Sequence, residues 1–304
     1  MSIIKKYITA SLVSDSDDDI DIDNNHNTFK SSKYSNSNDK VNTKNEVKIE
    51  NEVNTENEIN TENEVNTENE INTENKVKKV KKIKTPLKPY YNLDNTMEIG
   101  IDEAGRGPLF GRVYSAAVIL PKDDTFNHSL MKDSKKFSST KKIEEAEAYI
   151  KNNAIAWSVT YKDEIDIDDI NILQATQLSM HNAISNIQHK LKTSNNNLFM
   201  LVDGNYFKPY FSIDIITKQS MPIKYITVEK GDNTYSSIAA ASILAKVARD
   251  RYIMKLCEEN PELIEKYSIN SNKGYGSKKH LEGIEKYGIT KWHRRSFGIC
   301  RNYV

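Results

Sequence analysis

Apolar residues form short runs and one long periodic segment, nearly all of them after residue 96. Runs of five to eight residues that are rich in β-branched and aromatic side chains are typical of strands. Five such runs are predicted as strands: Met97–Ile101, Val113–Leu120, Ala154–Tyr161, Leu198–Val202 and Ile223–Val228. This part of the chain therefore contains enough strands for one sheet.

Two helices are expected between and after these runs. From Ile170 to Leu191, apolar residues recur at spacings of three, four and seven, which is the periodicity of an amphipathic helix. Asp168 and Asp169 precede this segment and are favourably placed at the positive end of its dipole. The stretch Ser236–Leu256 is rich in alanine and serine at first and amphipathic later. Strands followed by helices, with one helix interposed, predict an α/β layered fold.

The first 96 residues have a different composition. They contain no glycine or tryptophan, and from Asn51 the hexapeptide Asn-Glu-Val/Ile-Asn-Thr-Glu occurs four times. Such a polar segment buries too little apolar surface to offset its chain entropy. We therefore expect a disordered low-complexity tail over residues 1–96 and one folded domain over residues 97–304.

Charge is also unevenly distributed. The net charge of zero divides into +4 for residues 97–304, from 29 basic and 25 acidic residues, and −4 for the tail. The last 34 residues carry eight basic and two acidic groups, which form either a phosphate-contacting face or an ordinary solvated surface. Two interpretations are open for the Lys-rich linker, Lys76–Lys88. It is a functional segment, either a nuclear-localisation signal or a sequence-independent contact with nucleic-acid phosphates, or it is only a solubilising linker.

Composition disfavours several classes of protein. Two cysteines, Cys257 and Cys300, are too few for a disulfide scaffold or a thiolate zinc site, so a reducing intracellular compartment is the default. No apolar run approaches the ~20 residues that span a bilayer. Met1–Val13 makes a poor signal peptide. A cytoplasmic protein is expected, and a nuclear one if the Lys-rich linker is a localisation signal.

Acidic residues stand at the ends of three predicted strands. Asp102-Glu103 follows the first strand, Asp203 follows the fourth, and Asp232 comes shortly after the fifth. One carboxylate at a strand end is usually solvated or caps a helix. If neighbouring strands bring these side chains together, their mutual repulsion favours a divalent cation, and hard oxygen ligands suit Mg²⁺ or Mn²⁺. Pairs of such ions ~3.5–4 Å apart are widely used in phosphodiester hydrolysis.

Other chemistries have little support. The segment Gly105–Gly111 has the spacing GxGxxxG and precedes a strand, which does not fit a dinucleotide-binding loop. The six histidines form no HxH or HExxH motif, and no GxSxG motif occurs. The sequence does not exclude a Ser-His-Asp arrangement, but no motif supports it.

Seven sequence blocks, taken in order, resemble ribonuclease HII, the type 2 RNase H family, and the last block is typical of its bacterial branch. The resemblance extends over Met97–Tyr303. The blocks are GIDEAGRGPLFGRVYSAAVIL (Gly100–Leu120), DSKKFS (Asp133–Ser138), DDINILQATQLSM (Asp168–Met180), LVDGN (Leu201–Asn205), KGDNTYSSIAAASILAKVARDR (Lys230–Arg251), NKGYGSKKHLEGIEKYGIT (Asn272–Thr290) and HRRSF (His293–Phe297).

The resemblance implies an RNase H-like fold, with a mixed five-stranded sheet flanked by helices and a helical C-terminal extension. It implies an endonuclease that cleaves RNA in RNA–DNA hybrids and cuts on the 5′ side of single ribonucleotides in duplex DNA. The products would carry 3′-hydroxyl and 5′-phosphate ends, and two Mg²⁺ or Mn²⁺ ions would be the cofactors. By motif, the catalytic and metal-binding carboxylates are Asp102, Glu103, Asp203 and Asp232.

The resemblance also implies substrate contacts. Gly105-Arg106-Gly107 is expected to sense the 2′-hydroxyl through backbone groups, because glycine lets the backbone approach closely. Tyr275 is similar to the family tyrosine that packs on the sugar beside the ribonucleotide and contacts its 2′-hydroxyl. The expected phosphate contacts are Lys135, Lys246 and Arg249.

Three departures from the family pattern are visible. Phe137 stands where leucine is more common, and the N-terminal tail is outside the pattern. Gly276 follows Tyr275 where proline is common, which predicts a looser loop and weaker ribonucleotide discrimination. No QxxLxxFF-type sliding-clamp peptide occurs at the C-terminus, so no clamp partner is expected. A monomer that binds RNA–DNA hybrids and ribonucleotide-containing duplexes is the expected state.

Two other functions are weighed against the nuclease. A non-catalytic hybrid-binding protein would use the basic C-terminal segment and the Lys-rich linker, but it is expected to lack a carboxylate, and all four are present. A junction resolvase or integrase on the same fold is disfavoured by Gly105-Arg106-Gly107 and Lys273-Gly274-Tyr275.

Overall fold

The computed structural model of the chain describes residues 86–92, 94 and 96–304. Residues 1–85 of the predicted tail, with the hexapeptide repeats and most of the Lys-rich linker, lie outside this range. In the part of the chain that is described, no helix combines the length and the apolar character needed to cross a membrane.

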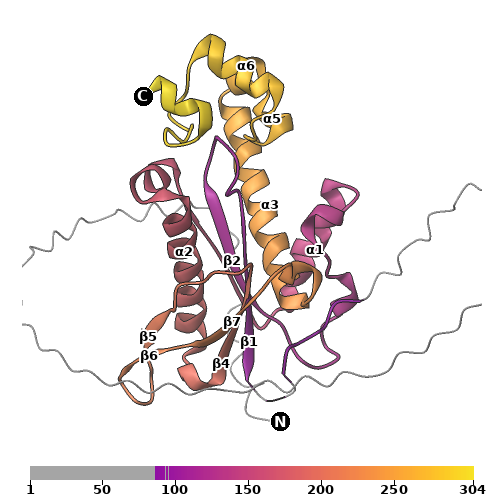
Figure 1. The fold of residues 1–304 in the computed structure, drawn as a ribbon. Coiled ribbons are helices and arrows are strands. Elements are labelled where there is room, and N and C mark those ends of the chain that lie inside the picture. The colour runs from indigo at the N-terminus through magenta and orange to yellow at the C-terminus, as the bar shows by residue number, and fades with distance from the viewer. Residues whose placement is uncertain (1–85, 93, 95) are drawn as a thin grey trace, which may run out of the picture. The chain divides into compact units, whose positions relative to one another are not determined.

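A five-stranded sheet forms the centre of the fold, in the order β3-β2-β1-β4-β7 (Figure 1). The strand β2 is antiparallel to β1 and β3, whereas β4 is parallel to β1 and β7, so the sheet is mixed. Both the five predicted strands and the α/β fold class are confirmed, although strand ends differ by up to three residues. The strands are β1 (Met97–Ala104), β2 (Val113–Ile119), β3 (Ala156–Lys162), β4 (Leu198–Asp203) and β7 (Lys224–Val228).

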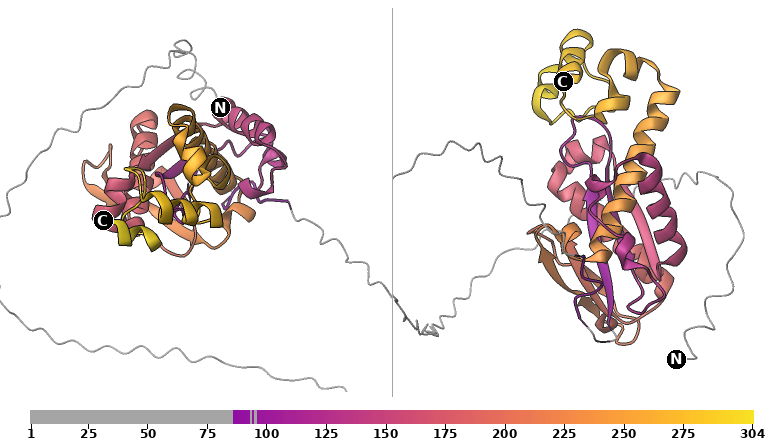
Figure 2. Two further views of the ribbon diagram at one scale, coloured as in Figure 1. Left: turned by 90° about the horizontal axis from the view of Figure 1, so that it is seen from above. Right: turned by 90° about the vertical axis from the view of Figure 1, so that its right-hand side faces the viewer.

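Helices cover both faces of this sheet. The helix α2 (Glu164–Leu191) packs on one face, and α1 (Thr140–Asn153) and α3 (Ser236–Glu259) pack on the other (Figures 1 and 2). Side chains alternate along a strand. In β2, Val118 therefore packs with the alanine-rich side of α3, and its neighbour Ile119 packs with α2. The predicted helix at Ser236–Leu256 is confirmed as α3.

The strand β1 and the helix α3 approach so closely that residue 100 has no space for a side chain. A Cβ atom on Gly100 would lie 2.1 Å from the carbonyl carbon of Ser237 and 2.5 Å from the amide nitrogen of Ile238. Both are main-chain atoms of α3, so a side chain here would have to displace the helix from the sheet.

Gly100→Ala is therefore expected to lower the free energy of unfolding by about 1–3 kcal/mol or more, because overpacking a buried contact forces backbone shifts. Chemical denaturation followed by circular dichroism measures this change. Gly276→Ala is the matched control, because its Cβ would meet Leu109 at an ordinary 3.4 Å. An equal loss of stability in both variants would contradict the close-packing explanation.

The helix α2 starts earlier than predicted and contains a break. It begins at Glu164 rather than Ile170, and Asn171 interrupts it with a φ of 67°. The side-chain oxygen of Asn171 accepts hydrogen bonds from the amides of Leu173 and Gln174, so it caps the second part of the helix. The prediction that Asp168 and Asp169 stand at the N-terminal end of this helix is wrong, because α2 begins at Glu164 and the acidic residues of its first turn are Glu164 and Asp166. The carboxylate of Asp168 accepts hydrogen bonds from residues 295 and 296 of the C-terminal segment.

The C-terminal part of the chain forms a helical extension beyond one end of the sheet (Figure 2). Its elements are α4 (Glu262–Tyr267), α5 (Ile269–Asn272), α6 (Lys278–Tyr287) and the 3-10 helix η6 (Gly298–Tyr303). The extension has its own core, which includes Leu263, Ile284 and Cys300. Phe110, from the loop between β1 and β2, is fully buried in that core. The extension therefore holds the segment Gly105–Gly111, which is called the glycine-rich loop below.

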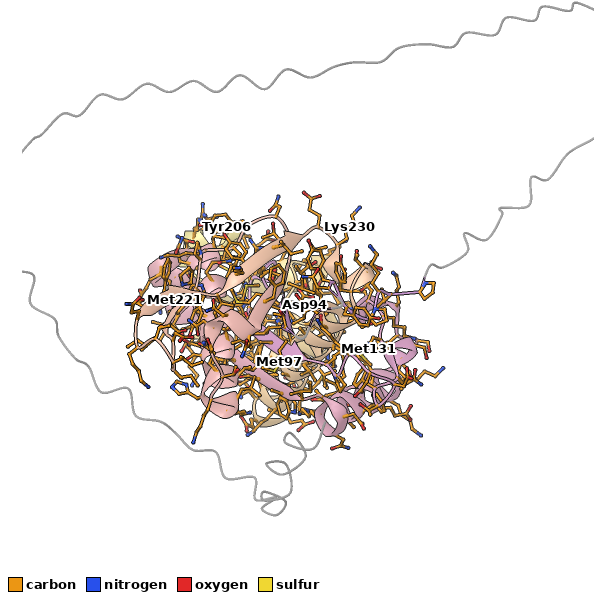
Figure 3. The ribbon with its side chains drawn as sticks, turned by 90° about the horizontal axis from the view of Figure 1, so that it is seen from below. Asp94, Met97, Met131, Tyr206, Met221 and Lys230 are labelled. Carbon is orange, nitrogen blue, oxygen red and sulfur yellow. The ribbon has the colours of Figure 1, made fainter. Side chains whose placement is uncertain are left out.

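Several elements were not predicted from the pattern of apolar residues. They include α1 and a hairpin of β5 (Phe211–Ile213) and β6 (Ser220–Pro222). Seen from below, Met221 of the hairpin and Met131 lie on opposite sides of Met97, where β1 begins (Figure 3). The short 3-10 helices are η2 (His128–Leu130), η3 (Ser134–Lys136), η4 (Asn195–Asn197) and η5 (Gly231–Asn233).

Residues ahead of Met97, where the folded domain was predicted to begin, are hydrogen-bonded to the rest of the described structure. The amide of Lys88 donates a hydrogen bond of 2.8 Å to the carbonyl of Thr234, and the carbonyl of Lys88 accepts one of 3.0 Å from the amide of Ser236. Glu98 accepts further hydrogen bonds from the amides at residues 91 and 92. These hydrogen bonds tie residues 88–92 to the folded part, which the polar composition of the segment does not reveal.

Candidate active site

The parallel strands β1 and β4 bring two of the predicted carboxylates to the same edge of the sheet. Ile101 is paired with Val202, and Asp102 and Asp203 occupy the next position of each strand. The carboxyl ends of neighbouring parallel strands are where α/β folds commonly place ligands. The strand order therefore gathers carboxylates that are about 100 residues apart in the sequence.

Asp102 and Glu103 lie inside β1 rather than after it. The strand was predicted to end at Ile101, but its pairing with β2 continues through Ala104. The backbones of both acidic residues are therefore fixed by the antiparallel ladder. This pairing holds the carboxylates on a rigid element, which favours a defined geometry at the site.

The fourth carboxylate, Asp232, reaches the same place from the turn after β7. Lys230 has a left-handed backbone conformation, with φ at 55°, and turns the chain into η5. The amide of Gly231 donates a hydrogen bond of 2.6 Å to Asp203 Oδ1, which ties this turn to the end of β4. A Cβ on Gly231 would lie 2.5 Å from the δ-methyl of Ile238 and 3.2 Å from Asp203 Oδ1, so a side chain at this position would force Ile238 to move.

One cleft of about 580 Å³ contains every site residue predicted from the sequence. Its lining includes Asp102, Glu103, Gly105, Arg106, Gly107, Lys135, Asp203, Asp232, Lys246, Arg249 and Tyr275. Ser134, Ser242, Asp250 and the segment 271–273 line it as well. The structure thus brings together carboxylates, cations, a glycine-rich loop and an aromatic ring.

The carboxylates of the cleft repel one another in a poorly solvated setting. Burial raises the pKa of Asp102 well above its usual range, and the neighbouring Glu103 and Asp203 raise it further. Burial also raises the pKa of Glu103, against the lowering effect of Arg106, and it raises the pKa of Asp203, against the amide of Gly231. A bound divalent cation would offset this repulsion.

Each carboxylate has a partner within the protein. Among the described residues, no three His, Cys, Asp or Glu side chains are already arranged to hold an ion. The donor set nevertheless fits Mg²⁺ or Mn²⁺, because it consists of hard carboxylate oxygens that can exchange these contacts for a cation. The contacts are Glu103 N to Asp102 Oδ1 at 2.7 Å, Arg106 Nη1 to Glu103 Oε1 at 3.3 Å, Gly231 N to Asp203 Oδ1 at 2.6 Å and Asn233 Nδ2 to Asp232 Oδ1 at 2.8 Å.

Three cationic side chains were expected to contact phosphate. In the structure two of them, both lysines, are accessible to solvent, and the third, an arginine, is buried. Lys135 is exposed and lowers the pKa of Glu103 through its charge, and Lys246 forms an ion pair of 2.7 Å with Asp250 at the edge of the cleft. Arg249 is only 3% exposed. Its guanidinium donates hydrogen bonds to backbone carbonyls at positions 110, 112 and 273, so it also holds two loops together. Its contact with phosphate stays a prediction.

Comparison with known proteins supplies the family. Residues 99–300 match the sequence model described as Ribonuclease HII. This chain belongs to the ribonuclease HII family. The ribonuclease HII of Bacteroides thetaiotaomicron is 43% identical over 213 residues, which cover 70% of this chain and 94% of that protein. The ribonuclease HII of Bacteroides fragilis is 45% identical, with the same coverage.

A solved structure agrees with the fold. The crystal structure of ribonuclease H2 from Pyrococcus horikoshii OT3 has a TM-score of 0.51 and 24% sequence identity, and the match covers 68% of this chain and 97% of that one. The resemblance seen in the sequence is therefore confirmed for family and fold. As a ribonuclease HII, the chain is a ribonuclease H, which is a metal-dependent hydrolase.

Sequence reasoning missed the role of Arg294 in this ribonuclease HII. The HRRSF motif indicates the family, but the sequence predicts no separate role for its two arginines. Arg294 is fully buried, and its guanidinium donates four hydrogen bonds to backbone carbonyls of the glycine-rich loop. The acceptors are Gly105 at 2.6 Å, Arg106 at 3.0 Å, Pro108 at 2.9 Å and Gly111 at 2.8 Å. Burial lowers its pKa to about 9, so it stays charged at neutral pH.

Arg294 also orients the amides of the loop. In a trans peptide, the carbonyl and the following N–H point in opposite directions. The carbonyls of Gly105 and Arg106 point at the guanidinium, so the N–H groups of Arg106 and Gly107 point away from it. Arg106 and Gly107 both line the cleft, so two neighbouring backbone donors belong to a loop segment that Arg294 holds in one orientation.

Tyr275 stands beside this loop. Its side chain is 52% exposed, and its ring lies 3.6 Å from where a Cβ of Gly107 would be. The guanidinium carbon of Arg249 lies 6.0 Å from the ring centre. The amide of Leu109 donates a hydrogen bond of 2.9 Å to the carbonyl of Gly274, so the segments that carry the loop and the tyrosine are directly joined. An exposed aromatic ring in a charged cleft is available to pack against a sugar or base.

Proposed function

We propose that this ribonuclease HII cleaves the RNA strand of RNA–DNA hybrids and cuts duplex DNA on the 5′ side of single embedded ribonucleotides. The products would carry 3′-hydroxyl and 5′-phosphate ends. The observation that carries the proposal is that one cleft is lined by four carboxylates and by the groups expected to read a 2′-hydroxyl. Groups suited to breaking a phosphodiester and to selecting a ribonucleotide are thus placed together.

Asp102, Glu103, Asp203 and Asp232 would hold two Mg²⁺ or Mn²⁺ ions. When bound, such ions polarise the scissile phosphate, lower the pKa of the attacking water and stabilise the departing 3′-oxygen. The protein's part is to present the carboxylates from two paired strands and one fixed turn. Asp102 and Asp232 are 5% and 8% exposed, so bulk water is largely excluded around them.

Selection of the ribonucleotide would depend on the glycine-rich loop and the tyrosine. The N–H groups of Arg106 and Gly107 would bond the 2′-hydroxyl, which is the group that separates RNA from DNA, and the hydrogen bonds of Arg294 to the carbonyls of Gly105 and Arg106 support this assignment. Tyr275 would pack on the adjoining sugar. Lys135 and Lys246 would attract the phosphate backbone, because neutralising phosphates releases counterions.

The direct test is cleavage of three labelled duplexes of one sequence: one with a single ribonucleotide, one continuous RNA–DNA hybrid and one all-DNA duplex. We expect cutting of the first two in Mg²⁺ or Mn²⁺, with the single-ribonucleotide cut on its 5′ side, and no cutting of the third. Excess EDTA should stop both reactions, because the carboxylates alone supply no Lewis acid. Full activity in EDTA would exclude the metal assignment. Equal cutting of an all-DNA junction would favour another nuclease on this fold.

Domain organisation and location are further parts of the proposal. We place the start of the catalytic unit near residue 86, because Lys88 is paired with the backbone beside Asp232, and we treat the preceding residues as an appended tail. Cys257 and Cys300 are free and buried, which is consistent with an intracellular, cytoplasmic enzyme. We expect a monomer without a sliding-clamp partner.

A further inference from the structure

Two histidines that have no part in the proposed chemistry lie buried behind the cleft. His280 is 0% exposed and His293 is 1% exposed, and their Nε2 atoms are 3.1 Å apart. The rings of Phe110 and Tyr267 pack edge-on against His293, with ring centres 5.1 and 5.2 Å away. A buried histidine pair of this kind requires that each ring nitrogen finds a partner.

The partners at the two ends of the pair determine where the protons are. The backbone N–H of Thr290 donates to His293 Nδ1 at 2.9 Å, so that nitrogen carries no proton. His293 Nε2 must then carry the proton and donate to His280 Nε2. His280 therefore has its proton on Nδ1, which donates to the carbonyl of Tyr275 at 2.9 Å. One arrangement of two neutral rings satisfies every donor and acceptor.

Burial supports the neutral state of both rings. It lowers the pKa of His293 to about 3, with a further contribution from His280, and it lowers the pKa of His280 as well. Neither ring is therefore expected to be charged near neutral pH. The chain of hydrogen bonds from Thr290 to the Tyr275 carbonyl is a fixed connection under these conditions.

This chain of hydrogen bonds ends at Tyr275, whose loop was expected to be loose because Gly276 follows it. The carbonyl of Tyr275 accepts from His280 and also from the amide of Ser277 at 2.7 Å, so the peptide between Tyr275 and Gly276 is held from two sides. The other end of the connection belongs to the segment that carries Arg294. The same short segment therefore holds both the glycine-rich loop and the tyrosine.

We propose that His280 and His293 are positioning residues that set the place of Tyr275 relative to the glycine-rich loop, and thereby set selectivity for single ribonucleotides. The inference rests on the proposed function. A single embedded ribonucleotide offers one 2′-hydroxyl, so its cleavage depends on accurate alignment of Tyr275 and the loop. A continuous hybrid offers a 2′-hydroxyl at every position of the RNA strand, so it tolerates misalignment better.

Two replacements of His280 separate positioning from stability. Asparagine places an amide N–H near the position of Nδ1, so His280→Asn retains the donor to the Tyr275 carbonyl. Glutamine places its amide near the position of Nε2, so His280→Gln loses that donor. Both variants disturb the same buried site, and Tm is measured for each. His181→Asn and His181→Gln are the controls. His181 is a half-buried histidine on α2, outside the lining of the cleft, and its Nε2 lies 2.8 Å from the carbonyl oxygen of Lys208.

The measurement is the ratio of kcat/KM on a single-ribonucleotide duplex to kcat/KM on a continuous hybrid. We expect His280→Gln to lower this ratio by about tenfold, since small misplacements of a positioned group carry large rate costs. His280→Asn and both His181 variants should stay within about twofold of the wild type. If His280→Gln does not fold, His293→Asn replaces it, because it retains an acceptor for Thr290 and loses only the donor to His280.

The outcomes distinguish the two proposals. An unchanged ratio in His280→Gln, with a Tm loss like that of His280→Asn, would show a structural role and overturn the positioning proposal alone. An equal fall of the ratio in both His280 variants would also overturn it. A wild-type enzyme that does not cut at the single ribonucleotide would overturn the proposed function, and the positioning proposal with it.

Discussion

Asp102→Asn is expected to reduce cleavage of both substrates by at least about a thousandfold, because loss of bound-metal charge stabilisation costs several kcal/mol. Asp102 is buried, whereas Glu103 and Asp203, the other two cleft carboxylates on strands, are partly exposed, and it lies beside both of them. Asparagine has the same shape but cannot provide an anionic oxygen. Single-turnover cleavage in Mg²⁺ measures the effect, and gel-shift binding shows that the duplex is still bound.

The stability of this variant provides a readout that does not depend on activity. The raised pKa of Asp102 means that its ionised form is unfavourable in the folded chain, so Asp102→Asn should raise Tm at neutral pH without metal. The gain should shrink as pH falls, because the folded wild type binds that proton before the unfolded chain does and becomes more stable. Added Mg²⁺ should raise the Tm of the wild type more than that of the variant.

The control for this prediction is the same substitution at an aspartate outside the cleft. Asp166 lies on α2 and pairs with Lys162 at 3.3 Å on the surface. Asp166→Asn should cleave at the wild-type rate and respond to Mg²⁺ as the wild type does. Wild-type cleavage by Asp102→Asn, or an equal Tm response of both variants to Mg²⁺, would contradict the assignment of Asp102 as a metal ligand.

Arg294→Lys is expected to lower the free energy of unfolding by about 3 kcal/mol or more, because each buried carbonyl left without a donor costs about 1–3 kcal/mol. The guanidinium reaches four carbonyls in one plane, and a lysine ammonium has three donors at a single point. The amides of the glycine-rich loop would lose their fixed orientation. Cleavage of both substrates should then fall by about a hundredfold.

The neighbouring arginine makes a direct comparison possible. Arg295 is exposed, and its amide, rather than its guanidinium, donates to Asp168. Arg295→Lys keeps the charge and should leave Tm and cleavage unchanged. Thermal unfolding and cleavage are measured on both variants at one salt concentration. A wild-type Tm in Arg294→Lys would show that the four hydrogen bonds do not stabilise the loop.

The strands were predictable because a strand is recognised by a short local pattern. All five predicted runs became strands of the central sheet, and the helix predicted at Ser236–Leu256 is observed as α3, Ser236–Glu259. The start of α2 was misplaced because its first turn is fixed by Asp163, whose side chain accepts from the amide of Asp166, and the segment has no strong apolar period there. The hairpin Phe211–Pro222 was missed because its strands are three residues long and largely exposed.

The residues of the candidate site that carry its chemistry were predictable from the sequence, but the residues that hold them in position were not. Asp102, Asp203 and Asp232 were found because each follows an apolar run, and the family motifs added Gly105–Gly107 and Tyr275. Nothing in the sequence pattern showed that Arg294 would donate to Gly105, which is 189 residues away. A buried arginine resembles any other basic residue of the C-terminal segment until the chain's path is known.

The sequence alone determined the strands and the family, and it predicted carboxylates as the metal-binding side chains. These features depend on local periodicity and on the order of short motifs. The tertiary structure decided how those parts are held. It showed that Asp102 and Asp203 occupy the same position in adjacent parallel strands, and that a C-terminal segment fixes both the glycine-rich loop and Tyr275. Hydrogen bonds between segments far apart in the chain depend on the packed geometry of the whole domain, and sequence spacing carries no record of them.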